Sequence, residues 1–224
     1  MGGMMGRRRA PGASGVQLGE ANARAAILEG AAKVFARVGV RSASVADILA
    51  EAGVSRRTYY RFYANKEEAL VALYRVGTDE LLAACRRAVA KEVDPLRQVE
   101  QCIEAHLRNA SVRGRLMFVL GGEAQRRESL LHARRMQVHA ELVALFVGAA
   151  GALGYGRSDA LLYRTLVLAL EGVTRIVLEE GDEGRKVSDA NIDRARKVMT
   201  RLASAALAGD AEGVTRRPAR KAAR

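Results

Sequence analysis

The segment VADILAEAGVSRRTYYRFYANKEEAL, residues 45–70, decides the fold that we expect for this chain. Its apolar residues at positions 45, 48, 49 and 52 recur at helical spacing, which predicts a short helix. Ser44 precedes this helix as its N-cap, and Asp47 stands three residues later, at the position of a capping-box acid. Gly53 then supplies the left-handed backbone that ends a helix at little steric cost. The segment therefore begins with a capped helix and a tight turn.

A second short helix is expected directly after the turn. Ser55 can cap it, and the residues that follow Ser55 begin a run rich in Arg and Tyr. This order is the signature of a helix-turn-helix DNA reader. In such a reader the N-terminal part of the second helix enters the major groove, because side chains there reach the base edges.

The side chains of the second helix suit contact with DNA. Arginine offers fork-shaped donors for guanine or phosphate, and hydroxyl groups can bind phosphate oxygens. Between them, Tyr59, Phe62 and Tyr63 can brace the helix on the core. Asn65 resembles the cap of a further helix, with Glu68 at its capping-box position. The candidate DNA contacts are Ser44, Ser55, Arg56, Arg57, Thr58, Tyr60, Arg61 and Lys66.

An alternative interpretation makes these arginines a solvated charged face with aromatic core residues between them. A charged face does not require a cap, a glycine and a second cap in this order. Moreover, the stretch from Ala25 to Leu70 resembles the DNA-binding domain of the TetR family of bacterial regulators. The resemblance rests on AAKVFARVGV, on TYYRFY preceded by GVS, and on NKEEAL.

The TetR resemblance implies a role for individual residues. Thr58, Tyr60 and Lys66 match positions that usually hold the phosphate backbone. Positions of the recognition helix that usually select the DNA sequence are matched by Arg56, Arg57 and Arg61. The chain departs from the family in two places, because Arg57 stands where many members have Gly or Pro, and Ala46 stands where some carry a long polar base reader. Base readout is therefore expected to rely more on the second helix.

Composition favours an all-α protein that lies in the cytoplasm. The 224 residues include six Tyr, four Phe, three Pro and no Trp. No run of 18 apolar residues is free of charge, so we expect no membrane span. The N-terminal arginines are not followed by an apolar stretch, which argues against a secretory signal. Cys85 and Cys102 lack metal-site spacing and are expected to be reduced thiols.

The net charge of +12 is concentrated near the DNA reader and in the two ends of the chain. Residues 21–66 alone carry eight Lys or Arg against three acids. We expect a basic flexible arm over residues 1–20, the helix-turn-helix domain over 21–66, a helical effector-binding and dimerisation domain over 67–208, and a basic flexible tail over 209–224. The arm either lies along the DNA backbone or minor groove or is merely solubilising.

Six further helices are expected after the reader, about nine in all. They are predicted over residues 66–93, from Pro95 onward, and over 116–123, 129–153, 158–180 and 188–207. The last two have large apolar faces, which in a monomer would need cover. In the TetR family these two helices pair with their copies as a four-helix bundle, so the resemblance implies a homodimer. The candidate interface is Leu162, Leu166, Ala169, Val173, Val177, Ile192, Ala195, Met199 and Leu202.

The resemblance also implies a small-molecule effector held by the middle helices. Candidate pocket residues are His106, Asn109, Met117, Phe118, Glu123, His139 and Tyr163. Each has a structural alternative: His106 can be a satisfied core histidine, Phe118 ordinary core, and Glu123 and His139 solvated. The face that joins His132, Arg135 and His139 is more typical of an exposed surface than of a ligand site. Few aromatic residues follow residue 75, so an elongated aliphatic ligand suits the Leu, Val and Ala lining better than a stacked planar one.

These observations predict a DNA-binding transcriptional regulator, with repression favoured and release from a near-palindromic operator by the effector. The alternative is an architectural or weakly specific DNA-binding protein without an effector. The chain has no H-E-x-x-H, P-loop, G-x-S-x-G or C-x-x-C motif, so we do not expect an enzyme, and no cofactor or metal is indicated. The expected partners are double-stranded DNA, a second copy of the chain and the effector, with no membrane.

Overall fold

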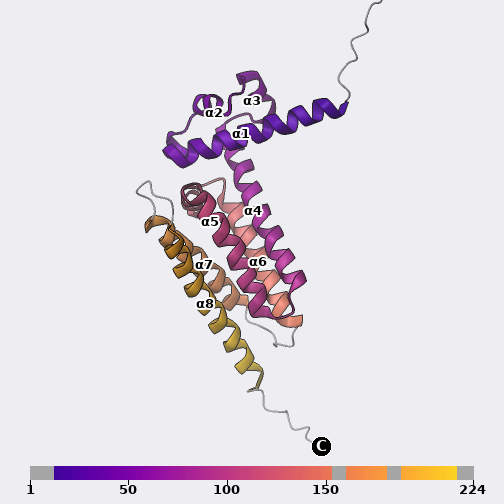
Figure 1. Ribbon diagram of the computed structural model, residues 1–224, viewed down its shortest axis with the longest axis vertical. Helices are drawn as coiled ribbons and strands as arrows, with labels where there is room; N and C mark the ends of the chain where they lie inside the picture. Colours follow the sequence, from indigo (N-terminus) through magenta and orange to yellow (C-terminus); the bar gives the residue numbers. More distant parts are fainter. Residues whose placement is uncertain (1–12, 153–159, 181–187, 216–224) are drawn as a thin grey trace, which may run out of the picture. The chain divides into compact units, whose positions relative to one another are not determined.

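The computed structural model describes residues 13–152, 160–180 and 188–215, and this part of the chain is entirely α-helical (Figure 1). It contains eight helices: α1 (Ala13–Ser42), α2 (Val45–Ala52), α3 (Arg56–Phe62), α4 (Lys66–Lys91), α5 (Pro95–Gln125), α6 (His132–Ala152), α7 (Ala160–Glu180) and α8 (Asp189–Thr215). The all-α prediction is confirmed. None of the helices in the described ranges is both long and apolar enough to cross a membrane.

The predicted total of about nine helices was one too high. Residues 116–123, expected as a separate helix, are the C-terminal part of α5. Helix α5 is kinked at Arg113, whose backbone is non-helical (φ −117°, ψ 20°), so α5 consists of two helical segments joined at that residue. No proline stands between Pro95 and Gln125, so the helical hydrogen-bond ladder is not broken by a missing donor.

The chain divides into two compact units, residues 1–73 and 74–224. The boundary falls inside α4, seven residues after the expected end of the DNA reader at Lys66. Helix α1 begins at Ala13, so residues 13–20 are helical rather than part of a flexible arm; residues 1–12 lie outside the described residues. At the other end α8 continues to Thr215, which corrects the first part of the expected tail, and residues 216–224 are also outside the described ranges.

The first unit is a small helical domain with one core. Ile27, Phe35 and Ile48 are fully buried in it, together with the ring of Tyr59. Helices α1 and α2 approach very closely at Gly30, where an added Cβ would lie 2.8 Å from the Cβ of Ala52. A larger residue at this position would force the two helices apart, so glycine permits the packing of α2 on α1.

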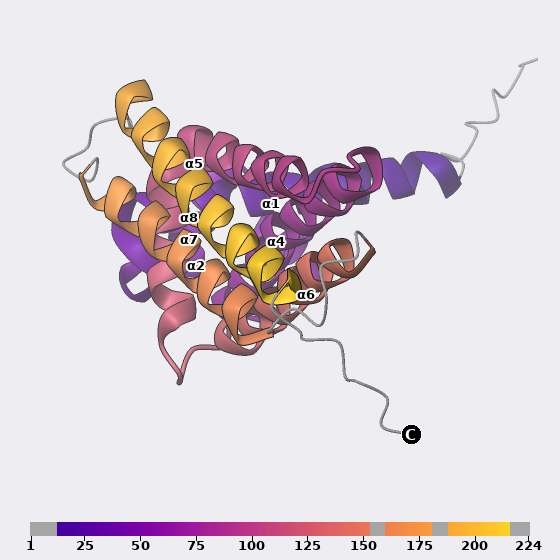
Figure 2. The ribbon, with the colours of Figure 1, turned by 90° about the horizontal axis from the view of Figure 1, so that it is seen from below.

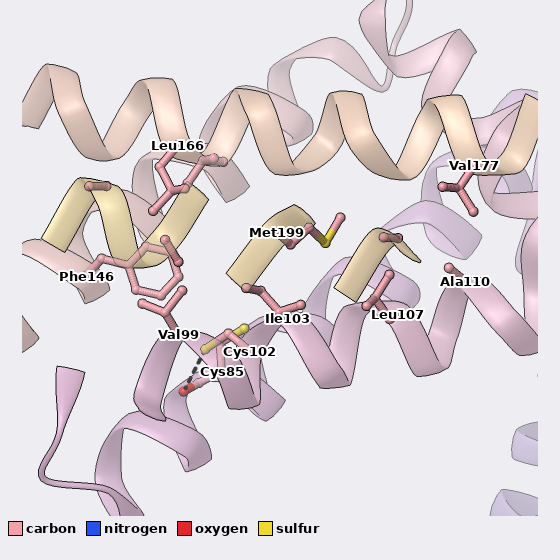
Figure 3. Packing of buried hydrophobic residues seen from close by; sticks show 14 of the residues in the cluster. Cys85, Val99, Cys102, Ile103, Leu107, Ala110, Phe146, Leu166, Val177 and Met199 are labelled. Atoms are coloured by element: carbon pink, nitrogen blue, oxygen red, sulfur yellow. Dashed lines mark hydrogen bonds between the residues drawn. The ribbon is translucent and has the colours of Figure 1, made fainter. Parts of the chain in front are cut away.

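The second unit is a helical bundle whose core is formed mainly by α5, α7 and α8, which lie side by side in two views (Figures 1 and 2). Met199 of α8, with Ile103 and Leu107 of α5, points into this core (Figure 3). Cys85 and Cys102 are both buried free thiols, and the Cys102 Sγ lies 3.8 Å from the Cys85 carbonyl oxygen. Within the described residues, no three His, Cys, Asp or Glu side chains gather as they would around a metal ion.

Candidate nucleic-acid interface

Helix α2 begins with the predicted capping box. The Asp47 backbone N–H donates to Ser44 Oγ at 3.2 Å, and the Ser44 backbone N–H donates to Asp47 Oδ2 at 2.9 Å. The Ser44 hydroxyl also donates to Asp47 Oδ2 at 2.6 Å, and this bond together with the one from the Ser44 backbone N–H lowers the pKa of the Asp47 carboxyl. The backbone N–H of each residue is thus hydrogen-bonded to the side chain of the other, so the start of the helix is fixed by local sequence.

The turn after α2 has the predicted left-handed glycine. Gly53 has φ 63° and ψ 29°, and its N–H donates to the Leu49 carbonyl at 3.1 Å. Ser55 then caps α3, because its Oγ accepts from the Thr58 backbone N–H at 3.1 Å. The Ser55 and Thr58 hydroxyls also share a hydrogen bond of 2.9 Å. The direction of α3 is therefore set by a cap, a glycine and a second cap, as the sequence predicted.

Helix α3 has one anchored side and one open side. Tyr59 is fully buried, and its hydroxyl donates to the Asn65 carbonyl at 3.1 Å. Burial raises the pKa of Tyr59 to about 12, so the phenol stays protonated as a donor. Tyr63 is also buried, as predicted, whereas Phe62 is only partly so. The open side carries Arg56, Arg57, Tyr60 and Arg61.

Asn65 caps α4, with a small change from the predicted pattern. Its Oδ1 accepts from the Glu68 N–H at 2.8 Å. The Glu68 carboxylate reaches back to the N–H of Ala64 at 2.8 Å, one residue before the cap.

Lys66 has a different environment from the one expected for a phosphate-binding lysine. Its ammonium donates to the backbone carbonyls of Val40 (3.1 Å), Arg41 (3.1 Å) and Ala43 (2.7 Å). These carbonyls lie at the end of α1 and just after it, where the helix itself provides no donor. Since an ammonium has three N–H donors, this arrangement can use all of them within the protein. No local pattern predicts this contact, because the partners lie 23 to 26 residues away from Lys66.

Comparison with known proteins agrees with this geometry. Residues 27–73 match the family model for bacterial regulatory proteins of the tetR family. This part of the chain is therefore similar to the tetR family over the helices α2 and α3 and the segments that flank them. It is 32% identical over 109 residues to the HTH-type transcriptional repressor KstR2 of Mycobacterium tuberculosis, a match that covers 48% of this chain and 54% of the relative. The chain thus spans about half the length of the curated relatives that it matches.

Solved structures of TetR-like regulators share the fold over a longer range. A regulator from Rhodococcus sp. RHA1 has a TM-score of 0.64 at 21% identity, covering 90% of this chain and 100% of that one. FadR from Bacillus subtilis, solved in complex with stearoyl-CoA, has a TM-score of 0.66 at 16% identity and covers 79% and 97%. The helices that follow the TetR-family domain therefore have the fold of these regulators.

In the second unit, part of the expected effector set gathers around a carboxylate that the sequence did not single out. Glu171 of α7 receives two hydrogen bonds from Arg135 of α6, at 2.8 and 2.5 Å, and lies 3.5 Å from His139 Nε2. Burial opposes ionisation of Glu171, but Arg135 outweighs it, so its pKa lies below the ordinary value. His106 Nε2 lies 2.9 Å from the hydroxyl of Thr174, one turn further along α7. Burial lowers the pKa of both histidines.

This cluster changes one expectation. The face of Arg135 and His139 is largely buried rather than exposed, with 12% and 10% of these side chains accessible. Glu171 pairs with Arg135 across helices, whereas Arg175 turns to Gln125 and Glu179. The signal available in the sequence was a charged residue inside an apolar helix, namely Glu171 in LALEGV.

The other candidate pocket residues are placed separately. Phe118 is partly buried, with the guanidinium groups of Arg115 and Arg175 over its ring at 5.8 and 5.4 Å. Glu123 is partly buried, and its carboxylate lies 3.9 Å from the guanidinium of Arg126, one turn away. Tyr163 is fully buried in the core cluster, and Met117 packs against that cluster from a partly buried position. Asn109 is partly buried.

The structure divides the candidate dimer residues between core and surface. Five of them are buried within the chain's own core, which corrects their assignment to an interface: Leu166, Val177, Ile192, Ala195 and Met199. Leu162, Ala169 and Val173 are partly buried, and Leu202 is exposed. The exposed apolar side chains of the last two helices are instead Leu161, Leu168, Ile176, Val198 and Leu202, which we call the α7–α8 stripe.

The Lys66 contacts predict a structural effect of its removal. Replacing Lys66 by Met leaves three carbonyls without their donor, and we expect the free energy of unfolding of the first unit to fall by about 2 kcal/mol. Urea denaturation followed by circular dichroism measures this. Lys33→Met is the matched control, because the Lys33 side chain is 55% accessible and forms ion pairs with Glu29 and Glu51. Unchanged stability together with equally weakened binding of all DNA sequences would favour a phosphate role for Lys66 instead.

Proposed function

We propose that this chain is a sequence-specific DNA-binding transcriptional regulator that represses from a near-palindromic operator and is released by a small aliphatic effector. The observation that carries the proposal is the orientation of α3. Its buried side is anchored by Tyr59, while its open side presents three arginines and Tyr60, which is 47% exposed. A rigid short helix with donors on one side is what readout in the major groove requires.

The exposed side chains divide into two roles. Arg57 and Arg61 are proposed to bind base edges, since an arginine fork fits the two acceptors of guanine. Arg56 is assigned to base readout on the same grounds. Thr58 and Tyr60 are proposed to hold phosphate oxygens, which positions the helix without reading sequence. Ser44 and Ser55 serve first as helix caps, so any contact they make with DNA would be additional.

A homodimer is proposed through the α7–α8 stripe. Leu161, Leu168 and Ile176 follow one another at two-turn spacing along α7, with 65%, 43% and 58% of each residue exposed. On neighbouring α8, Val198 and Leu202 are one turn apart and are 40% and 38% exposed. Covering apolar surface contributes roughly 25 cal/mol per Å². A second copy that presents the same stripe would cover it with a four-helix arrangement, and would supply the second recognition helix for a two-fold operator.

The effector is proposed to be an acyl thioester or a similar aliphatic compound. FadR of Bacillus subtilis, whose fold this chain shares, was solved with stearoyl-CoA. In this chain, Leu170 and Val173 of α7 pack against the apolar core, and the partly buried Glu171 of the same helix pairs with Arg135. An apolar lining with a few convergent polar groups is typical of a small-molecule site. Thermodynamic linkage then requires the ligand and DNA to weaken each other's binding by the same factor.

Sequence-specific binding is tested by selecting bound sites from a random DNA library and then titrating salt on the selected and random duplexes. We expect a two-fold site with half-site centres about 34–36 Å apart and a preference of about a thousandfold or more. Arg57→Ala and Arg61→Ala should each change base preference by about 1–3 kcal/mol. Tyr60→Phe should weaken all sequences alike. Similar affinity for both duplexes would instead indicate an architectural DNA-binding protein.

Dimer formation is tested by placing a charge in the α7–α8 stripe. Leu168→Glu should convert the dimer to a monomer of 24.1 kDa in light scattering, because an unpaired carboxylate would be buried at the interface. The matched control is Val112→Glu on α5, where the replaced valine is 76% exposed and outside the stripe. A wild-type chain that is monomeric at micromolar concentration while binding its operator would contradict the proposal.

The effector class is tested by thermal shift. Stearoyl-CoA should raise the melting temperature and weaken operator binding, since it binds the folded state. Free CoA is the control for the head group alone. Stabilisation by planar aromatic compounds such as ethidium, with stearoyl-CoA silent, would overturn the aliphatic assignment.

A further inference from the structure

The N-terminal part of α1 extends beyond the TetR-family match and contacts the recognition helix. The match begins at residue 27, whereas α1 begins at Ala13. Helices α1 and α3 are in contact, and Glu20 and Arg24 stand one turn apart on the added part of α1. The chain therefore has two charged side chains beside α3 that the family-matched domain does not include.

Both side chains contact the C-terminal end of α3, Arg24 at the Phe62 ring and Glu20 at Arg61. The guanidinium of Arg61 lies over the Phe62 ring at 4.9 Å, and that of Arg24 lies over the same ring at 5.4 Å. Glu20 Oε1 lies 3.7 Å from Arg61 Nη2. The Arg61 side chain is thus held between a ring and a carboxylate, both supplied by the protein.

The Glu20–Arg61 pair contributes little to folding, because 45% of the Glu20 side chain and 55% of the Arg61 side chain are accessible to solvent. Its effect on DNA binding concerns which DNA groups the Arg61 guanidinium contacts. A free arginine on a DNA-facing helix is attracted to the nearest phosphate, and a phosphate contact carries no sequence information. A guanidinium held over a ring has fewer orientations open to its planar fork, and readout of a base edge requires a defined orientation. A carboxylate next to it also repels phosphate.

We propose that Glu20 is a specificity-determining residue that positions the Arg61 guanidinium on the Phe62 ring for base readout and opposes its sequence-neutral contacts with phosphate. This inference rests on the proposed function, since Glu20 acts through a base-reading arginine. Its ligand is double-stranded DNA. Glu20 thereby lowers the overall affinity for DNA and increases the discrimination between DNA sequences.

The proposal is tested with the full chain by fluorescence anisotropy on the selected operator and on a random duplex of equal length. Glu20→Gln should tighten binding to the random duplex roughly fivefold, the contribution of about one added phosphate contact. Operator affinity should change little, so the preference for operator falls by the same factor. Glu29→Gln is the matched control, because Glu29 loses the same charge on α1 but pairs with Lys33 of that helix at 3.1 Å. It should leave the preference unchanged.

A double variant separates positioning from simple charge. In an Arg61→Ala background, Glu20→Gln should no longer change the preference, because the side chain through which it acts is gone. If the fivefold effect persists there, or if Glu20→Gln and Glu29→Gln behave alike, the positioning role of Glu20 is refuted. A wild-type chain that does not prefer the operator at all refutes the proposed function itself, which is a different result.

Discussion

The placement of α3 depends on one constraint, which is that the backbone N–H groups and carbonyls on either side of Gly53 are hydrogen-bonded. Ser44 and Asp47 close the start of α2, the left-handed glycine ends it, and Ser55 closes the start of α3. Each of these groups would otherwise leave a donor or acceptor to water. Because the turn before α3 and the start of α3 are both fixed by hydrogen bonds, this helix of only seven residues still presents its arginines in a set direction.

Long-range contacts then convert this local motif into a rigid unit. Gly30 lets α1 and α2 touch, Tyr59 ties α3 to the residue before α4, and Lys66 ties the start of α4 to the end of α1. Tyr59 is buried and packs in the core, whereas the adjacent Tyr60 is exposed on the surface. The residues that hold α3 in place are thus distinct from those exposed on its open side.

The second unit was harder to predict because its last helices are apolar on more than one face. In α7, the sequence favoured the face of Leu166 and Val177 as the dimer contact, but these residues fill the chain's own core. The exposed face is that of Leu161, Leu168 and Ile176. Periodicity identifies apolar faces without saying which neighbour covers each one. The same limit applies to Glu171, whose partners Arg135 and His139 come from another helix.

The sequence by itself determined the all-α class, the caps, the glycine turn and the exposed basic side of α3, because these features depend on residues within a few positions of one another. Only the tertiary structure decided where Lys66 donates, which side chains surround Glu171 and which apolar face of α7 stays open. It also decided that Glu20 lies beside Arg61, 41 positions further along the chain. Such contacts depend on how the helices pack. A local pattern of residues does not show which side chain of another helix will lie next to a given residue.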